Sequence, residues 1–381
     1  MNKAYEFRLK PNKEQKVFFS KTFGCCRKYW NENIALYNLK VEEGKKEPWL
    51  AIYPAKLKEK FPFLKEVDSL ALANEQLRLN KAIKDYKKGL KGKPKFHSKN
   101  KDEDSYTTNN IRGSIRLEGK YIKLPKVGMV RIVKHREVEG IIKNITVKYK
   151  NNHYYISIVT DIEKEPIKKV NPKTIIGFDY SSPLSWIDSE GYNPDNRFYR
   201  KNINKVKKND TKLSRKKLHS QNWKKQLKKN NKLHEKIKNQ RKDLLHKESK
   251  KYVDNYDILV FEDLDLKGIS KALKLGKSTL DNGFGMFRTF VKYKAENQGK
   301  YFFKVNKNNT TQTCSNCGNI KIKEEKIKLG IKTYICKHCG VSLDRDINAA
   351  INIRNRGWDY LYSLLNNESR DLCSQEALSF R

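Results

Sequence analysis

Four cysteines in the last quarter of the chain have the spacing of a metal site. They form two pairs, Cys314-Ser-Asn-Cys317-Gly and Cys336-Lys-His-Cys339-Gly, with 18 residues between the pairs. This spacing is typical of a zinc ribbon, in which each pair lies on a tight turn and supplies half of a tetrahedron. Because four thiolates leave no position for water, we expect a structural Zn²⁺ ion. A redox dithiol or an iron-sulfur cluster is the alternative, which this spacing favours less.

Three carboxylates lie where predicted core elements end. Asp179 follows the apolar run 174–178, Glu262 follows the run 258–261, and Asp346 lies just beyond the cysteines. Taken singly, each has a structural explanation, as a turn residue, a charged strand end and a helix N-cap respectively. Together they match phosphodiester hydrolysis, which uses several carboxylates around two Mg²⁺ ions about 4 Å apart. We therefore expect the three to meet in a nuclease site.

The composition favours a polyanionic partner. The 381 residues include 83 lysines and arginines but only 43 acidic residues, for a formal charge of +40. The excess is densest over residues 200–251, which hold 21 basic and four acidic residues. Nucleic acid is the expected partner, because neutralising phosphates releases counterions and strengthens binding. The alternatives are a merely lysine-rich protein and, for residues 200–251, a solvated helical hairpin.

The sequence does not favour a membrane or an oxidising compartment. No apolar run approaches the roughly 20 residues that a membrane-spanning helix needs, and no signal peptide opens the chain. The seven cysteines are an odd number and do not form a disulfide framework. We therefore expect a cytoplasmic protein without a membrane partner, in which Cys25, Cys26 and Cys373 are ordinary buried or tail residues.

Hydrophobic periodicity divides the chain into segments with different predicted secondary structure. A short strand over residues 4–9 precedes a helix from about Lys13 to Tyr37, and an apolar stripe from Leu72 to Leu90 predicts a second helix. Residues 105–160 alternate in the manner of a small antiparallel barrel or sandwich. After a charged linker, strands alternate with helices, which indicates an α/β fold. Its predicted elements are strands 174–178, 257–261 and 301–305, a hairpin at 185–188 and helices around 287–295 and 348–353.

The order of these motifs resembles that of the transposon-encoded TnpB proteins, relatives of the type V CRISPR effectors. The motifs are Gly177-Phe-Asp179, Phe261-Glu262-Asp263-Leu264, the two cysteine pairs, and Asp344-Arg345-Asp346-Ile-Asn348-Ala-Ala. Residues 3–15, 23–31 and 94–96 are also similar to that family. The resemblance therefore extends over nearly the full chain, to about Asn355.

The resemblance implies a multidomain fold with α/β and β parts. An RNase H-like (RuvC) nuclease with an inserted zinc ribbon would follow a β-barrel wedge domain, into which a helical recognition domain is inserted. The expected segments are a wedge strand (1–12), the recognition domain (13–104), the wedge β-barrel (105–170), the nuclease (171–307) with its basic helical hairpin (200–251), the zinc ribbon (308–341), the last nuclease helix (342–360) and a tail (361–381).

The resemblance also implies an activity. It is that of an RNA-guided, Mg²⁺-dependent DNA endonuclease encoded by a transposon, cutting double-stranded target DNA beside a short target-adjacent motif. The guide RNA would come from the transposon end, with one protein copy per RNA, in the cytosol of a prokaryote and at the nucleoid when bound. By motif, Asp179, Glu262 and Asp346 are the catalytic Mg²⁺ ligands, Asp344 is the other acidic position of the last motif, and Asp263 is the fallback for Glu262.

One position departs from the family pattern, and two rival functions stay open. Ser181 stands two places beyond Asp179, where the family usually has glycine. The first rival is a guided DNA binder without nuclease activity, which commonly has lost the active-site acids that this chain retains. The second is an RNase H-like nuclease or transposase that uses no guide. The basic helices and the predicted barrel ahead of the nuclease make this second rival less favoured.

Overall fold

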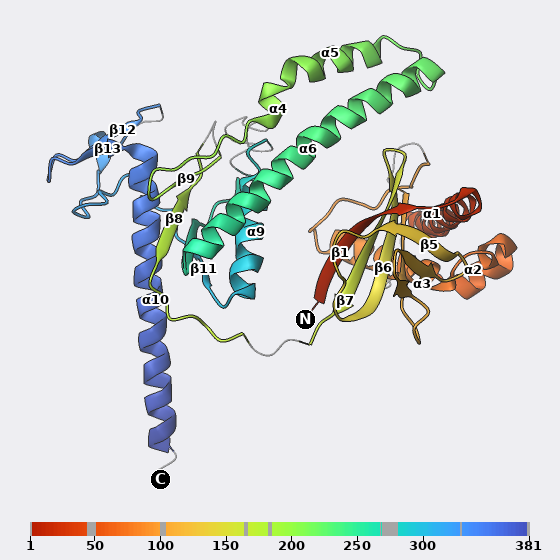
Figure 1. The fold of residues 1–381 in the computed structure, drawn as a ribbon, viewed down its shortest axis with the longest axis horizontal. Helices are drawn as coiled ribbons and strands as arrows, with labels where there is room; N and C mark the ends of the chain where they lie inside the picture. The colour runs from red at the N-terminus through yellow and green to blue at the C-terminus, as the bar shows by residue number, and fades with distance from the viewer. Residues whose placement is uncertain are drawn as a thin grey trace. The chain divides into compact units, whose positions relative to one another are not determined.

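The computed structural model describes residues 2–43, 51–99, 104–163, 167–181, 185–266, 268, 281–327 and 330–378. The chain divides into two compact units, Met1–Glu165 and Pro166–Arg381, which we call unit 1 and unit 2 (Figure 1). Each unit has its own main sheet and its own buried apolar core.

Unit 1 is built on a seven-stranded antiparallel sheet. Its strands are β1 (Asn2–Lys10), β2 (Asp104–Asn109), β3 (Arg116–Glu118), β4 (Tyr121–Leu124), β5 (Gly128–Val133), β6 (Ile141–Lys150) and β7 (His153–Asp161). The strand order is β2-β6-β7-β1-β5-β4-β3, so the first strand of the chain lies between two strands from much later in the sequence. Among the described residues no ladder joins the edge strands β2 and β3, and closure into a barrel stays a prediction.

The alternation seen in the sequence places one face of this sheet in the core. Ile145 and Val147 of β6 pair with Ile158 and Ile156 of β7, and all four side chains are buried. Because successive side chains of a strand point to opposite faces, the residues between them reach the other face. The apolar face packs against α1 (Lys13–Glu42).

The helices of unit 1 begin as predicted and end differently. Asn12 caps α1 by accepting a hydrogen bond from the backbone of Gln15 at 2.8 Å, and the Gln15 side chain accepts one from the Asn12 backbone at 3.1 Å. The helix continues beyond the predicted end. The other helices are α2 (Pro54–Lys60), η1 (Pro62–Lys65) and α3 (Ser69–Lys87). The prediction that Leu90 belongs to the apolar stripe of this helix was wrong. Helix α3 ends before Leu90, and that residue is 70% exposed.

The isolated cysteines of unit 1 are core residues. Cys25 and Cys26 lie on α1 and are buried, which confirms their prediction. Burial raises the pKa of both thiols, Cys26 more than Cys25, so both stay protonated and unreactive at neutral pH. The side chain of Cys373 lies outside the described residues.

Unit 2 contains the predicted α/β sheet. Its strands are β8 (Ile175–Asp179), β9 (Ile187–Asp188), β10 (Ile258–Glu262) and β11 (Tyr301–Val305), in the order β11-β10-β8-β9. The central strand β10 is parallel to β8 and β11, and β9 returns antiparallel to β8 as the predicted hairpin. All five residues of β10 are buried, as expected for a parallel strand covered on both faces.

The helices of unit 2 are α4 (Phe198–Lys201), α5 (Ile203–Ser214), α6 (Gln221–Asn255), α9 (Phe284–Asn297) and α10 (Arg345–Leu378). Of these, α6 and α9 pack on one face of the sheet and α10 on the other. Phe178 and Phe261 stack on each other and pack with α6 and α9, whereas Ile258 and Val260 pack against α10 through Ile353. Figure 1 shows α10 running along β8. The helix continues to Leu378, so the segment 361–381, predicted as a tail, is helical through that residue.

Two glycines allow α10 to lie close to the sheet. A Cβ atom on Gly177 of β8 would lie 2.6 Å from the Arg354 nitrogen and would also overlap the Ala350 carbonyl, both in α10. A Cβ atom on Gly357 of α10 would lie 2.9 Å from Cγ1 of Val260, which is the register partner of Gly177 on β10. The helix therefore crosses two neighbouring strands at backbone distance.

The basic segment 200–251 is helical, as predicted. Helices α5 and α6 lie side by side (Figure 1) and are joined by polar contacts. Asn230 donates a hydrogen bond to Asp210 at 2.9 Å, and Gln226 donates one to the Asn209 side chain at 3.4 Å. Most of the lysines on the two helices are exposed. Among the described residues, no helix has the length and apolar character that a membrane span requires.

Because α10 lies so close to the sheet, we expect that a single methyl group added at Gly177 or Gly357 destabilises unit 2. We expect Gly177→Ala and Gly357→Ala each to destabilise unit 2 by about 1–3 kcal/mol, since the added atom meets backbone or a stiff valine. Gly24→Ala on α1 is the control, because nothing lies within 4 Å of its added Cβ. It should be neutral or stabilise by up to about 1 kcal/mol. Unfolding midpoints in urea measure the difference, and equal midpoints for all three variants would contradict the packing described above.

Candidate functional site

The fold brings the three predicted carboxylates into one region of unit 2. Asp179 ends β8 and Glu262 ends β10, each one residue beyond the register pair Phe178 and Phe261. Because the strands are parallel, both carboxylates emerge at the same edge of the sheet. Asp346 lies in the first turn of α10, which packs on β8. All three side chains are only 6% exposed.

The charges of the other two carboxylates both act on Asp179. Burial raises the pKa of its carboxyl well above the usual value, and the negative charges of Glu262 and then Asp346 raise it further. A carboxylate in such surroundings is stable only with a compensating cation or a proton. A raised pKa with two acidic neighbours is typical of a functional site.

Glu262 is held by a residue that precedes the cysteine pairs. The Thr310 hydroxyl donates a hydrogen bond to Glu262 Oε1 at 2.7 Å, in a buried contact. Burial raises the pKa of Glu262, although Thr310 and the charges of Arg356 and Lys307 act in the opposite direction. The carboxylate is thus oriented by a neutral donor and keeps its capacity to bind a cation.

Asp346 has its own basic partners. Lys332 donates to Oδ2 at 2.8 Å, and Arg345 donates to Oδ1 at 2.9 and 3.1 Å. Although burial opposes ionisation, these hydrogen bonds lower the pKa of Asp346. The hydroxyl of Ser181, the residue that departs from the family pattern, also donates to Oδ2 at 3.2 Å. Asp346 is therefore ionised and in contact with the loop that follows Asp179.

The two secondary acidic candidates lie differently. Asp344 Oδ1 accepts hydrogen bonds from the backbone of Asp346 at 2.7 Å and of Ile347 at 3.2 Å, so it caps α10. The structural explanation of Asp346 as the helix N-cap is therefore wrong. Asp263 is exposed and paired with Lys304 at 2.9 Å, outside the buried group, which leaves Glu262 as the acid that faces Asp179.

The carboxylates and the cysteines differ in compactness. Across the described residues, Cys314, Cys317, Cys336 and Cys339 form the group of potential ligands whose donor atoms all lie within 4.8 Å of one another. Asp179, Glu262 and Asp346, which are also described, do not form such a compact group. Hard cations such as Mg²⁺ prefer carboxylate oxygens and keep several waters, so an open set with net negative charge suits them. The donor types therefore fit Mg²⁺, and the cysteines fit a soft metal.

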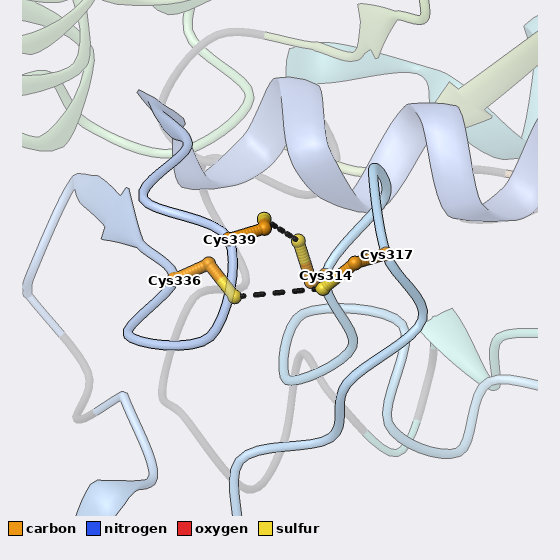
Figure 2. Close-up of side chains that lie close together, drawn as sticks. All are labelled: Cys314, Cys317, Cys336 and Cys339. Atoms are coloured by element: carbon orange, nitrogen blue, oxygen red, sulfur yellow. Dashed lines mark hydrogen bonds between the residues drawn. The ribbon is translucent and has the colours of Figure 1, made fainter.

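The four cysteine side chains point toward one another (Figure 2). The Sγ atoms of Cys314 and Cys339 are 3.7 Å apart, as are those of Cys317 and Cys336. A tetrahedral zinc site with Zn–S bonds of about 2.3 Å places its sulfurs about 3.8 Å apart. The pairs come from the segment after β11 and from the turn between β12 (Thr333–Ile335) and β13 (Ser342–Asp344). The predicted set of four ligands is brought together as expected.

The segment around the first cysteine pair is tied to α10. Asn348 accepts a hydrogen bond from the Ser315 backbone at 2.9 Å and donates one to the Thr313 carbonyl at 2.7 Å. Asn352 donates to the carbonyls of Thr310 and Thr313. The same helix carries Asp346, and Thr310 contacts Glu262. The cysteine cluster and the carboxylates therefore share a support.

Sequence reasoning missed the residues that hold the carboxylates. Thr310 and Lys332 carry no motif signal, and nothing in the sequence marks them. Arg345 stands inside the quoted last motif, between two aspartates, so its contact with Asp346 could have been inferred. Ser181 was noticed as a departure, but its partner is far away in the sequence.

Three family models match the chain. A Cas12f1-like TNB domain matches residues 284–353, a probable transposase matches residues 157–273, and a helix-turn-helix domain matches residues 1–46. The first includes all four cysteines and Asp346, and the second includes Asp179 and Glu262. In the described part of residues 1–46, the structure shows one strand and one long helix.

Two relatives that match over about 90% of their length have the same general description, and a third matches over a shorter segment. A putative RNA-guided DNA endonuclease, InsQ, of Escherichia coli K12 is 30% identical over 379 residues, covering 93% of this chain and 92% of its own. A putative RNA-guided DNA endonuclease of Streptomyces pristinaespiralis is 25% identical over 370 residues, covering 94% and 90%. A Cas12f1 CRISPR-associated endodeoxyribonuclease of Sulfoacidibacillus thermotolerans is 30% identical over 122 residues, covering 32% and 28%.

The fold is similar to that of a solved complex. The protein in a cryo-EM structure of a Cas12f1-sgRNA-target DNA complex aligns with a TM-score of 0.55 at 13% identity, covering 93% of this chain and 98% of that one. At this identity the likeness concerns the fold, a mixed α/β architecture.

The raised pKa of Asp179 predicts a stability cost that grows with pH. Because the pKa is higher in the folded state than in the unfolded state, ionisation lowers stability as pH rises above the usual aspartate range. We expect Asp179→Asn to raise the melting temperature by a few degrees in Mg²⁺-free buffer at pH 8, with a smaller gain near pH 5. Asp263→Asn is the control, since the pKa of Asp263 is lowered. A gain for Asp263→Asn, or none for Asp179→Asn, would contradict the charge cluster.

Proposed function

Because the chain belongs to the TnpB family of transposon-encoded RNA-guided DNA endonucleases, we propose that it cuts DNA at a site that an RNA guide selects. The proposed reaction is phosphodiester hydrolysis with Mg²⁺ held by Asp179, Glu262 and Asp346. The observation that supports this proposal is that three buried acids from distant segments lie in one region of unit 2, where two of them raise the pKa of the third.

The chemistry of the group follows from its charge. When bound, a pair of Mg²⁺ ions would activate water and stabilise the leaving oxygen of the cut strand. Asp179 would contact the cation most directly, because it has the strongest need for a compensating positive charge. Thr310 orients Glu262, and Ser181 orients Asp346. Lys332 and Arg345 neutralise Asp346 while no cation does so, and they would lose these contacts when the carboxylate turns toward metal.

The nucleic-acid partners are proposed from charge and family. A guide RNA drawn from the transposon end would select double-stranded target DNA by base pairing, with one protein copy per RNA. Helices α5 and α6, with their exposed lysines, would lie along the phosphates. Unit 1 would contain the wedge and recognition domains, which would read the target-adjacent motif. This activity would require the prokaryotic cytosol as its location, with access to the nucleoid.

The cysteine cluster is proposed to hold a structural Zn²⁺ ion. Its four sulfurs have the separation that tetrahedral zinc requires, and they leave no open position for water. Its hydrogen bonds to Asn348 and Asn352 would then keep the start of α10, and hence Asp346, in place.

The first test of the function is the loss of Asp179. With a guide RNA and target DNA supplied, Asp179→Ala should reduce Mg²⁺-dependent cleavage by at least about 10³-fold, since a metal ligand contributes several kcal/mol. RNA and DNA binding should be nearly unchanged in a gel-shift assay. Asp263→Ala is the matched control, because this acid lies outside the buried group. Undiminished cutting by Asp179→Ala would rule out the proposed site.

The guide is tested by the RNA that stays with the protein. Purification from the host followed by sequencing should recover one RNA species that includes the transposon end. Cutting by a preparation that holds no RNA would instead favour a guide-free nuclease. RNA binding without any cutting would favour a guided DNA binder.

The zinc proposal predicts the effect of Cys314→Ser. This variant should lose its zinc, measured by elemental analysis, and its cleavage should fall, because the segment that supports α10 loses its metal. Cys25→Ala is the control, since that buried thiol lies on α1 and should leave the zinc content unchanged. Retained zinc and activity in Cys314→Ser would contradict the assignment.

A further inference from the structure

A continuous set of buried polar contacts links the basic helices of unit 2 to the carboxylate group. It runs from Arg200 on α4 and Arg241 on α6, through Asp281 and Asn282, to Ser181. The exposed fractions are 1% for Asp281, 0% for Asn282 and 3% for Ser181. None of these residues is assigned a role in the reaction proposed above except Ser181, which contacts Asp346.

Ser181 connects two segments of the site. Its hydroxyl donates to Asp346 Oδ2 at 3.2 Å, and its backbone carbonyl accepts a hydrogen bond from Asn282 Nδ2 at 3.3 Å. It lies two residues after Asp179, so its position along the chain is fixed by β8. A side chain at this point can therefore set the distance between Asp346 and Asp179, which a glycine could not do.

Asn282 is held in turn by the basic helices. Its Oδ1 accepts a hydrogen bond from Arg200 Nη2 at 2.6 Å, and its backbone carbonyl accepts one from the Ser185 hydroxyl at 3.4 Å and one from the Asn196 amide. Both polar ends of the Asn282 side chain are thus used. A buried amide with this pattern has one orientation, because turning it would place like groups together.

Asp281 anchors this arrangement by charge. Its carboxylate accepts hydrogen bonds from Arg241 Nη2 at 2.8 Å and Arg200 Nε at 3.3 Å, and from the backbone of Tyr199 at 2.9 Å and of Arg200 at 3.1 Å. A buried carboxylate with two guanidinium partners strongly resists the loss of either partner. The segment that ends at Gly283 is also close to α6, where a Cβ on Gly283 would lie 3.0 Å from Leu245. The segment 281–283 is therefore held by both charged and packing contacts.

We propose that Ser181 is a positioning residue, which holds Asp346 at the distance from Asp179 that cation binding requires, and that Asn282 holds Ser181 in turn on the anchor formed by Asp281, Arg200 and Arg241. The inference rests on the proposed function, because it concerns the cation that the three acids would bind. It gives a role to the serine that replaces the family's usual glycine.

The test measures metal binding without nucleic acid, so it does not depend on cleavage. Mn²⁺ serves as the probe, and its affinity is measured by electron paramagnetic resonance for the wild type, Ser181→Ala and Ser181→Gly. Loss of the hydroxyl should weaken Mn²⁺ binding roughly tenfold, as for other residues that orient metal ligands. The Mg²⁺ concentration for half-maximal cleavage should rise by the same factor, with RNA binding unchanged.

Two further variants complete the experiment. Ser249→Ala is the control, because this fully buried serine of α6 bonds to its own helix and to Lys294, and Mn²⁺ affinity should not change. Asn282→Ala should weaken Mn²⁺ binding. In the double variant with Ser181→Ala, the fold-loss of Mn²⁺ affinity should be smaller than the product of the two single fold-losses, because both substitutions act through one contact. If Asn282→Ala fails to fold, the Ser181 variants alone decide the matter.

The outcomes separate the two proposals. If Asp179→Ala abolishes Mn²⁺ binding while Ser181→Ala leaves it unchanged, the positioning role is overturned and the cation site stands. If the wild type binds no Mn²⁺ at the carboxylates, both proposals fail. A weakened affinity in both Ser181 variants, with normal binding in Ser249→Ala, supports the positioning role.

Discussion

The arrangement of unit 2 depends on the backbone contact between α10 and the sheet. Gly177 on β8 lies against Ala350 and Arg354 of the helix, and Gly357 of the helix lies against Val260 on β10. Because Gly177 and Val260 are register partners, the helix crosses the two strands that end in Asp179 and Glu262. A larger side chain at either glycine would push the helix outward and move Asp346 away with it. The carboxylate group is therefore a consequence of packing between residues that have no chemistry of their own.

This packing collects negative charge in a place that water does not screen. Like charges at low exposure oppose folding, so the site is compensated in several ways. Asp346 has Lys332 and Arg345, Glu262 has the Thr310 hydroxyl, and the pKa of Asp179 is left well above its usual value. A group of buried carboxylates that destabilises the fold would gain most from binding a cation. Such a cost in stability is common in preorganised functional sites.

The segment that carries the first cysteine pair also contacts helix α10. Asn348 and Asn352 connect α10 to the segment that begins the cluster, and Thr310 connects that segment to Glu262. The segment around the first cysteine pair is thus part of the support of the carboxylates. A second set of contacts, through Asp281, Asn282 and Ser181, connects α4 and α6 to Asp346. The basic surface and the acidic centre are physically continuous.

The sequence alone identified the candidate site residues and most elements around them. Local sequence pattern is enough to predict three features. These are the spacing of the four cysteines, the apolar strands before Asp179 and Glu262, and the basic segment 200–251. Local pattern could not show where α3 ends, that Asp344 and not Asp346 caps α10, or that α10 continues to Leu378. Only the tertiary structure decided that Ser181 contacts Asp346, that Thr310 contacts Glu262, and that Gly177 and Gly357 admit the helix. These contacts join residues far apart in the chain, and hydrogen-bond partners of that kind leave no periodic signal.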